Sequence, residues 1–237
     1  MTIHLLVCDY FSDEMPEWEP SFPNFFVRMF NSAAGTEPVY RLYDVQNGQL
    51  PLQLCRGELY VITGARASAY DNDPWITALK DFIKRAQEHG VPMVGICFGH
   101  QLLAQALGGR VEQAAKGWGA GIRTSRIVDE EMERWFGGSE LRLFYNHHDQ
   151  VTLLPPKAQL LATSPFCPIE AFKIGSNIIG FQGHPEYTRR YMEHVIGIAK
   201  GESTDRLRGG LESCVQDNAM GQQVARFILK AISSERH

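Results

Sequence analysis

The sequence lacks a cysteine framework. Five cysteines are spread over 237 residues, an odd number with no CxxC pair among them. This pattern argues against a set of disulfides and against a structural zinc site. We therefore expect a reducing, cytoplasmic environment, in which most of these cysteines are small, inert core residues.

A long apolar run and an excess of positive charge are also missing. No stretch approaches the roughly 20 apolar residues that cross a bilayer. The run Ile3–Val7 is too short for a signal peptide and is soon followed by Asp9. Lysine and arginine number 23 against 27 aspartates and glutamates, a formal net charge of −4. We expect neither a membrane nor nucleic acid among the partners.

Apolar runs and helical patterns alternate along the chain. Residues 74–89 give the clearest helix, because Asp73 can cap it, Pro74 suits its first turn and Gly90 suits its end. The alternation predicts an α/β fold in which helices cover both faces of a parallel sheet. The other elements predicted in this half are strands at 3–8, 39–45, 59–63 and 91–96 and helices at 22–30 and 101–107.

The middle of the chain has a different pattern. Short runs rich in β-branched and aromatic residues are separated by turn residues, which predicts an antiparallel or mixed section. These runs are residues 121–128, 141–145, 160–163, 170–174 and 177–182. A helix over 188–200 and an amphipathic helical region over 204–233 follow. We expect one domain over residues 1–200 and a helical C-terminal extension, 201–237, packed on it.

A nucleophile elbow is predicted around Cys97. An apolar strand runs into Gly95-Ile96-Cys97-Phe98-Gly99, and a helix follows. This is the cysteine form of the motif in which glycines flank a nucleophile on a tight strand-to-helix turn. The amide N–H groups at the start of the helix favour the thiolate, which is the nucleophilic form of cysteine. The alternative is an inert, buried cysteine beside a glycine turn. The other residues of a catalytic constellation, if the sequence contains them, distinguish the two interpretations.

His184 and Glu186 have the pattern of a base and its orienting carboxylate. They end the predicted strand 177–182 in the order Gly183-His184-Pro185-Glu186. Proline keeps the preceding histidine extended, so side chains 184 and 186 face the same way. Glu186 can then hold the imidazole as the third member of a triad does. The competing interpretation is a turn histidine beside a solvent-exposed glutamate.

Together, the two motifs resemble those of the class I glutamine amidotransferases. The resemblance covers roughly residues 1–200 and rests on Gly-Ile-Cys-Phe-Gly-His-Gln and Gly-His-Pro-Glu, in that order. It implies a three-layer α/β sandwich with a mostly parallel central sheet. It also implies a Cys–His–Glu triad, with Cys97 as nucleophile, His184 as general acid–base and Glu186 as orienter.

The same resemblance implies further site residues. The backbone N–H groups of Gly64 and Phe98 are expected to form the oxyanion hole. The glutamine head group is expected to contact Gln101, Asn146, His148 and Asp149. The His147-His148-Asp149 run also admits a metal interpretation, but no third partner is signalled. We expect no metal and no cofactor.

One loop departs from the family pattern. Many members carry Gly-Gly-Pro after the early strand, whereas this chain has Gly64-Ala-Arg-Ala-Ser-Ala-Tyr-Asp71. This loop resembles that of a stand-alone subgroup that includes the γ-glutamyl peptide hydrolases of plants. Arg66, Tyr70 and Asp71 are candidates to contact the part of the substrate beyond the γ-amide, or else they form a solvated loop. The segment 10–30 is given no function.

The expected activity is release of the γ-amide of glutamine or of a γ-glutamyl conjugate through a thioester on Cys97. No Gly-x4-Gly-Lys-Ser/Thr loop for ATP is present, so a synthetase half would be a separate chain. Three alternatives stay open: a glutaminase subunit that delivers ammonia to such a chain, a regulatory or binding protein on the same fold, and another cysteine hydrolase or redox sensor.

Overall fold

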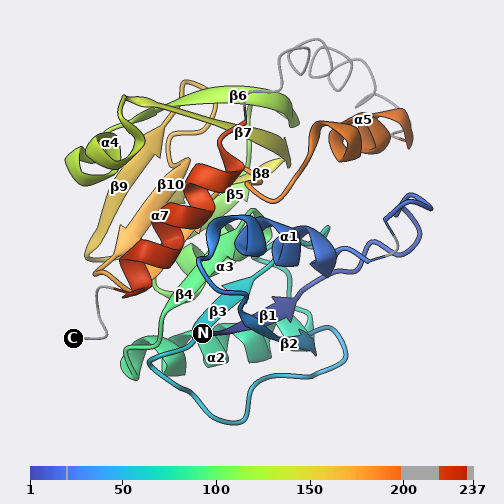
Figure 1. Ribbon diagram of the computed structural model, residues 1–237, viewed down its shortest axis with the longest axis vertical. Coiled ribbons are helices and arrows are strands. Elements are labelled where there is room, and N and C mark those ends of the chain that lie inside the picture. The colour runs from blue at the N-terminus through green and yellow to red at the C-terminus, as the bar shows by residue number, and fades with distance from the viewer. Residues whose placement is uncertain (20, 199–218, 234–237) are drawn as a thin grey trace.

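A nine-stranded sheet forms the centre of the molecule, with helices on both of its faces (Figure 1). The computed structural model describes residues 1–19, 21–198 and 219–233. The strand order is β2-β1-β3-β4-β11-β10-β9-β6-β7. The strands are β1 (Thr2–Val7), β2 (Val39–Asp44), β3 (Leu59–Ile62), β4 (Met93–Ile96), β6 (Gly119–Ile127), β7 (Glu140–His147), β9 (Ala158–Thr163), β10 (Ala171–Ile174) and β11 (Ile178–Phe181).

The strand directions confirm the α/β class and the mostly parallel sheet. Strands β2, β1, β3, β4 and β11 pair in parallel. Beyond β11 the pairings become antiparallel, so β10 and β6 are the strands of this sheet that run the opposite way. The antiparallel section predicted for residues 121–182 is therefore confirmed.

Two separate hydrophobic cores lie on the two faces of the sheet. Strands β1, β3 and β4 are buried on both sides, which is why they are almost continuously apolar. Helices α2 (Pro74–Glu88) and α3 (Phe98–Ala106) pack on one face, where Ile62 and Phe82 meet. Helices α1 (Pro23–Ala33) and α7 (Gly221–Ser233) cover the other face, where Val61 and Phe26 meet.

Three elements escaped the sequence patterns. Strands β5 (Arg110–Gln113) and β8 (Asp149–Leu153) form a small second sheet, and both are short and partly exposed. Helix α4 (Glu130–Phe136) has only seven residues and one buried side chain, Met132. Elements with so few buried positions show no period that a sequence analysis can detect.

Helix ends agree with the expected caps in part. Asp73 occupies the N-cap of α2 with extended backbone, but its side chain makes no cap hydrogen bond. Gly90, just beyond α2, takes a positive φ of 64°, as a C-terminal glycine does. Helix α5 (Arg189–Ile198) follows Thr188, whose hydroxyl accepts a hydrogen bond from the N–H of Tyr191 at 3.2 Å.

The described part of the C-terminal region belongs to the main core. Val224 and Ile228 of α7 are fully buried in the same cluster as β1 and β3. The expected domain boundary at residue 200, the end of the helix expected over 188–200 and the first part of the helical region lie outside the described residues. No helix within 1–19, 21–198 or 219–233 has the length and apolarity to cross a membrane.

We predict that Ile228→Ala lowers the free energy of unfolding by about 2–5 kcal/mol, because it leaves a cavity in a shared core. Urea unfolding followed by tryptophan fluorescence and by circular dichroism measures the change. Both probes should still report one common transition. Gln223→Ala, at an exposed position of the same helix, is the control. Separate transitions for the two probes would show that α7 folds independently.

Candidate active site

Cys97 sits on a strained turn between β4 and α3. Its backbone has φ 54° and ψ −107°, a left-handed conformation that non-glycine residues avoid. Glycines make the turn feasible. A Cβ at Gly99 would overlap the carbonyl of Ile62 in β3, and one at Gly95 would overlap the backbone of Gly99. The elbow predicted from the sequence is therefore present.

The strand order brings the remaining groups to Cys97. Ile62 and Phe181 flank β4 from either side, in register with Gly95 and Ile96. The loops after β3 and β11 consequently leave the sheet beside the loop that carries Cys97. The side chain of Gln182, the first residue after β11, donates from Nε2 to the Cys97 sulfur at 3.8 Å.

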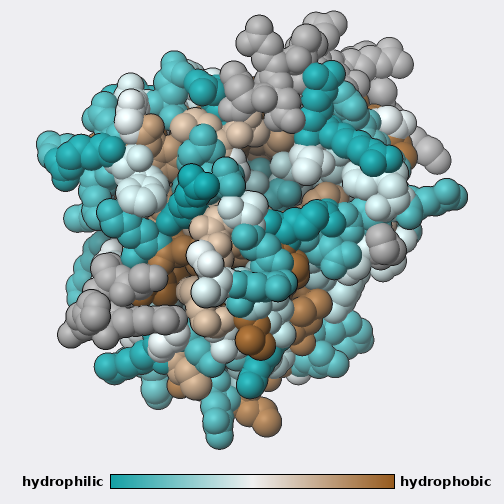
Figure 2. Space-filling model, viewed as in Figure 1, coloured by the Kyte–Doolittle hydropathy of each residue, from teal (hydrophilic) through white to brown (hydrophobic). Residues whose placement is uncertain are grey.

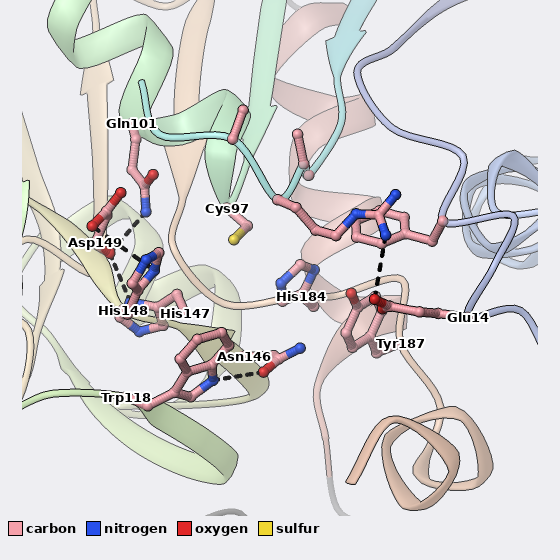
Figure 3. Close-up of a pocket in the computed structure, with 15 residues that line it drawn as sticks. Glu14, Cys97, Gln101, Trp118, Asn146, His147, His148, Asp149, His184 and Tyr187 are labelled. Carbon is pink, nitrogen blue, oxygen red and sulfur yellow. Dashed lines mark hydrogen bonds and ion pairs between the residues drawn. The ribbon is translucent and has the colours of Figure 1, made fainter. Parts of the chain in front are cut away.

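His184 and Glu186 form a buried pair at the end of β11. His184 Nδ1 and Glu186 Oε1 are 2.8 Å apart, and both residues are almost fully buried. The N–H of His184 also donates to the carbonyl of Phe144 at 2.7 Å, which fixes the extended backbone. The exposed-glutamate interpretation is wrong for this chain. In Figure 3 the imidazole of His184 lies beside the Cys97 sulfur.

The charge state of His184 is set by opposing effects. Burial alone lowers the pKa of the imidazole, but the carboxylate of Glu186 and the sulfur of Cys97 outweigh it and raise the pKa to about 10. The ring is consequently an imidazolium at neutral pH in the free protein. A cation held between a carboxylate and a sulfur is what a thiolate nucleophile requires.

Tyr187 is a site residue that the sequence patterns missed. Its ring stacks on the imidazole of His184 with centroids 3.9 Å apart and planes inclined by 11°. The ring also packs edge-on against Tyr191. An aromatic face stabilises a neighbouring cation and fixes the plane of the ring. Tyr187 directly follows the Gly-His-Pro-Glu motif, but no spacing rule marks it.

His184 and Cys97 line a cavity of about 360 Å³, a size typical of small-molecule sites. Figure 3 shows Gln101, Asp149, His148 and Trp118 on one side of Cys97 and His184. Glu14 lies on the other side, with the Arg66 loop. The cavity therefore has two walls with the reactive groups between them.

The first wall is built around Asp149. Its carboxylate accepts hydrogen bonds from Ser68 at 2.6 Å and from Tyr70 at 3.1 Å. Gln101 donates to the backbone carbonyl of Asp149 at 2.8 Å and to the side chain of Gln182 at 3.1 Å. Both hydroxyls are neutral, and His148, whose Nδ1 stands 3.8 Å from Asp149 Oδ1, is a cationic partner only when its ring is protonated; Asp149 lines the cavity.

Asn146 and His148 complete this wall with Trp118. The indole N–H of Trp118 donates to Asn146 Oδ1 at 2.8 Å. Because an indole can only donate, the amide nitrogen of Asn146 must point the other way, and Figure 3 shows it directed into the cavity. His148 stacks on Trp118 with centroids 5.0 Å apart. Asn146 and His148 lie on either side of His147 at the junction of β7 and β8.

His147 lines the cavity as a neutral ring. Burial lowers the pKa of His147 to about 3. Its Nδ1 donates to the carbonyl of Asp149 at 2.8 Å. No group of three or more His, Cys, Asp and Glu side chains suited to a metal ion occurs within residues 1–19, 21–198 and 219–233.

Gly64 lies against the reactive groups. A methyl group there would stand 3.4 Å from His184 Cε1 and 3.8 Å from Cys97 Cβ. Phe98 is the first residue of α3, so no preceding helical turn supplies an acceptor for its N–H. The two expected oxyanion donors thus flank Cys97.

The Gly64–Asp71 loop places its three candidate residues differently. Arg66 lines the cavity. Tyr70 bonds to Asp149 behind the first wall, and Asp71 accepts a hydrogen bond from the N–H of Ser68 at 2.8 Å. Neither of these two lines the cavity. Phe11 and Glu14 do line it, although no function was expected for segment 10–30.

Comparisons with known proteins agree with this geometry. Residues 59–197 match the family model described as Glutamine amidotransferase class-I. Gamma-glutamyl peptidase 4 of Arabidopsis thaliana is 32% identical and aligns over 88% of this chain and 87% of its own length. A glutamine-hydrolyzing GMP synthase subunit of Pyrococcus furiosus is 37% identical over 50% of this chain and 62% of its own length. A glutamine amidotransferase of Thermotoga maritima has the same fold, with a TM-score of 0.72 at 23% identity over 98% of this chain and 96% of its own.

We predict that Gly99→Ala destabilises the protein by about 1–3 kcal/mol, because the added methyl group must displace the backbone of Ile62. The midpoint of urea unfolding measures the loss. Gly35→Ala is the matched control, since a Cβ there meets nothing within 4 Å. Equal midpoints for the two variants would mean that the elbow is not tightly packed.

Proposed function

Since the chain belongs to the class I glutamine amidotransferase family, we propose that it hydrolyses the γ-amide bond of glutamine or of a γ-glutamyl conjugate. The proposal rests above all on Cys97 and His184, which share one cavity, and on the buried pairing of His184 with Glu186. The buried 2.8 Å bond between His184 and Glu186 leaves the other ring nitrogen of His184 for Cys97. A binding protein has no need of a strained cysteine beside a buried imidazolium.

The first half of the reaction forms a thioester. The Cys97 thiolate attacks the δ-carbon of the γ-glutamyl group, and the carbonyl oxygen becomes an oxyanion. The N–H groups of Gly64 and Phe98 hold that oxyanion, an interaction typically worth about 3 kcal/mol per donor. The tetrahedral intermediate then expels the amine, which takes its proton from His184 Nε2.

Hydrolysis completes the cycle. His184, now neutral, removes a proton from a water molecule that attacks the thioester carbonyl. The C–S bond breaks, glutamate leaves, and the thiolate and imidazolium are restored. Glu186 stabilises the imidazolium at each stage and holds the ring in one tautomer.

The first wall suits the amino-acid end of the γ-glutamyl group. Asp149 offers a negative charge to the α-ammonium, and Asn146 offers an N–H donor to the α-carboxylate. The Nε2 of Gln101 is used by the Asp149 carbonyl and the Gln182 side chain, so its Oε1 is the atom that this cavity-lining residue offers to the head group. His148 borders the carboxylate position.

The second candidate is a glutaminase subunit that passes ammonia to a separate synthetase chain. The observation that favours it is the similarity to the GMP synthase subunit of Pyrococcus furiosus. That relative aligns over only half of this chain, whereas the γ-glutamyl peptidase aligns over 88% of it. We therefore place hydrolysis by the chain alone first.

We predict that the purified chain alone releases glutamate from L-glutamine or a γ-glutamyl dipeptide, and that Cys97→Ala abolishes this release. Coupled glutamate detection measures turnover, and circular dichroism checks that the variant is folded. Cys167→Ala is the control, because that thiol is buried away from the cavity. Turnover by the Cys97 variant would overturn the mechanism. If the folded wild type releases no glutamate and mass spectrometry detects no thioester, the result would favour a glutaminase subunit that needs a separate synthetase chain.

We predict that Glu186→Gln reduces kcat/KM and shifts its alkaline limit to lower pH. Without the carboxylate, burial dominates and lowers the pKa of His184. The ring then loses its proton earlier as the pH rises, and with it the ability to protonate the leaving amine. The pH profile from 6 to 10 measures the shift. An unchanged alkaline limit would show that Glu186 does not set the charge of the ring.

A further inference from the structure

The wall opposite Asp149 is built by the segment between β1 and α1. Phe11 and Glu14 of this segment line the cavity together with Arg66 and Tyr187. If the first wall holds the glutamyl head group, this second wall faces the leaving group. Its chemistry then decides which amines the site accepts.

Arg66 is already occupied by carboxylates. Its Nε and Nη2 donate to the two oxygens of Asp9 at 2.8 and 3.0 Å. Its Nη1 donates to Asp13 at 2.9 Å and to Glu14 at 3.3 Å. Four of the five N–H donors of a guanidinium are thereby directed at acidic partners. Arg66 consequently fastens the segment and does not present a receptor for a substrate anion.

The segment has a defined shape. Phe11 takes a positive φ of 50°, and its N–H donates to Asp9 Oδ1 at 2.9 Å. The N–H of Glu14 closes a turn onto the carbonyl of Phe11 at 2.8 Å. From the other side, His194 of α5 bonds to the carbonyl of Glu14 at 2.8 Å. These bonds fix the backbone of Glu14, which carries the carboxylate.

The charges on this wall do not cancel. One guanidinium faces three carboxylates, those of Asp9, Asp13 and Glu14. A hydrogen bond from its own backbone and the Arg66 guanidinium lower the pKa of Asp13, so this side chain is ionised at neutral pH. Asp9 pairs with the guanidinium through both of its oxygens, so the carboxylate of Glu14, the one of the three that lines the cavity, remains in excess. Such a surface attracts a cation and repels a carboxylate.

A second feature places the reacting bond beside this wall. His184 Nε2 is buried and has no hydrogen-bond partner within the described residues, although it opens to the same cavity. This nitrogen is where the mechanism delivers a proton to the departing amine. The chain beyond that amine must extend toward Glu14, because Asp149 and its neighbours occupy the opposite direction.

We propose that the Phe11–Glu14 segment is the leaving-group subsite and that Glu14 selects γ-glutamyl conjugates whose leaving amine carries a second, positively charged group. The inference rests on the proposed function. The substrate class is therefore the γ-glutamyl amides of diamines or other cationic amines. Conjugates whose leaving group ends in a carboxylate, such as simple γ-glutamyl dipeptides, are turned over more slowly.

Three substrates of equal length test the charge preference. They are the γ-glutamyl amides of 1,4-diaminobutane, butylamine and 4-aminobutanoate, whose leaving groups end in an ammonium, a methyl and a carboxylate. We expect kcat/KM for glutamate release to fall in that order, by about tenfold from first to last, since each half-exposed charge pair contributes up to about fivefold. The ratio should shrink in 0.5 M salt. Equal rates, or faster turnover of the carboxylate, would overturn the proposal.

Variants assign the preference to residues. Glu14→Gln should reduce the ammonium-to-carboxylate ratio severalfold while the butylamide is still hydrolysed. Glu17→Gln removes the same charge from an exposed position of the segment that does not line the cavity, and it should leave the ratio unchanged. Equal effects of Glu17→Gln and Glu14→Gln would refute the subsite. Absence of turnover with all three substrates would refute the subsite if L-glutamine is still hydrolysed, and would contradict the proposed hydrolysis itself if L-glutamine is not hydrolysed either.

Discussion

The close approach of three backbones at the elbow is the constraint on which the rest depends. The carbonyl of Ile62, the backbone of Gly99 and the turn at Cys97 lie so near each other that no side chain fits between β3 and the start of α3. This contact holds β3 and β4 in register at their carboxyl ends. Because β11 is parallel to β4 on the other side, the loops with Gly64 and His184 emerge beside the sulfur. Ligands of open α/β sheets bind at this edge for the same reason.

The hydrophobic surface in Figure 2 is broken up by polar side chains on the face it shows. The cores lie inside, between the helices and the sheet.

Much of this arrangement could be predicted from the sequence, because the relevant signals are local. Glycines at 95 and 99 mark the elbow, and proline at 185 sets the direction of its two neighbours. The long helix at 74–88 shows its apolar stripe. What escaped prediction depends on distant contacts. Tyr187 acquires its place by stacking on His184, and Phe11 enters the cavity only because a loop crosses from β1 to α1. Strand β8 escaped the sequence patterns, since its pairing with β5 leaves few residues buried.

The state of His184 illustrates how opposing effects are resolved inside the site. Burial favours the neutral ring, as it does for His100 and His147, whose pKa values fall to about 3. His184 is buried as deeply, yet its pKa rises, because a carboxylate lies at hydrogen-bond distance from its Nδ1. The hydrogen bonds of His100 and His147 go to backbone carbonyl groups. One acidic partner therefore distinguishes the ring that can carry a proton from two rings that hold the scaffold together.

Partners that folding brings close also decide the role of Arg66. In the sequence it is, with Tyr70 and Asp71, a candidate to contact the part of the substrate beyond the γ-amide. In the fold, Asp9 comes from the end of β1 and approaches it with both carboxylate oxygens, and Asp13 and Glu14 take its remaining Nη1 donors. A guanidinium that is saturated in this way contributes order and leaves the surplus charge negative. The sign of a binding surface is thus decided by the partners that folding brings to a residue.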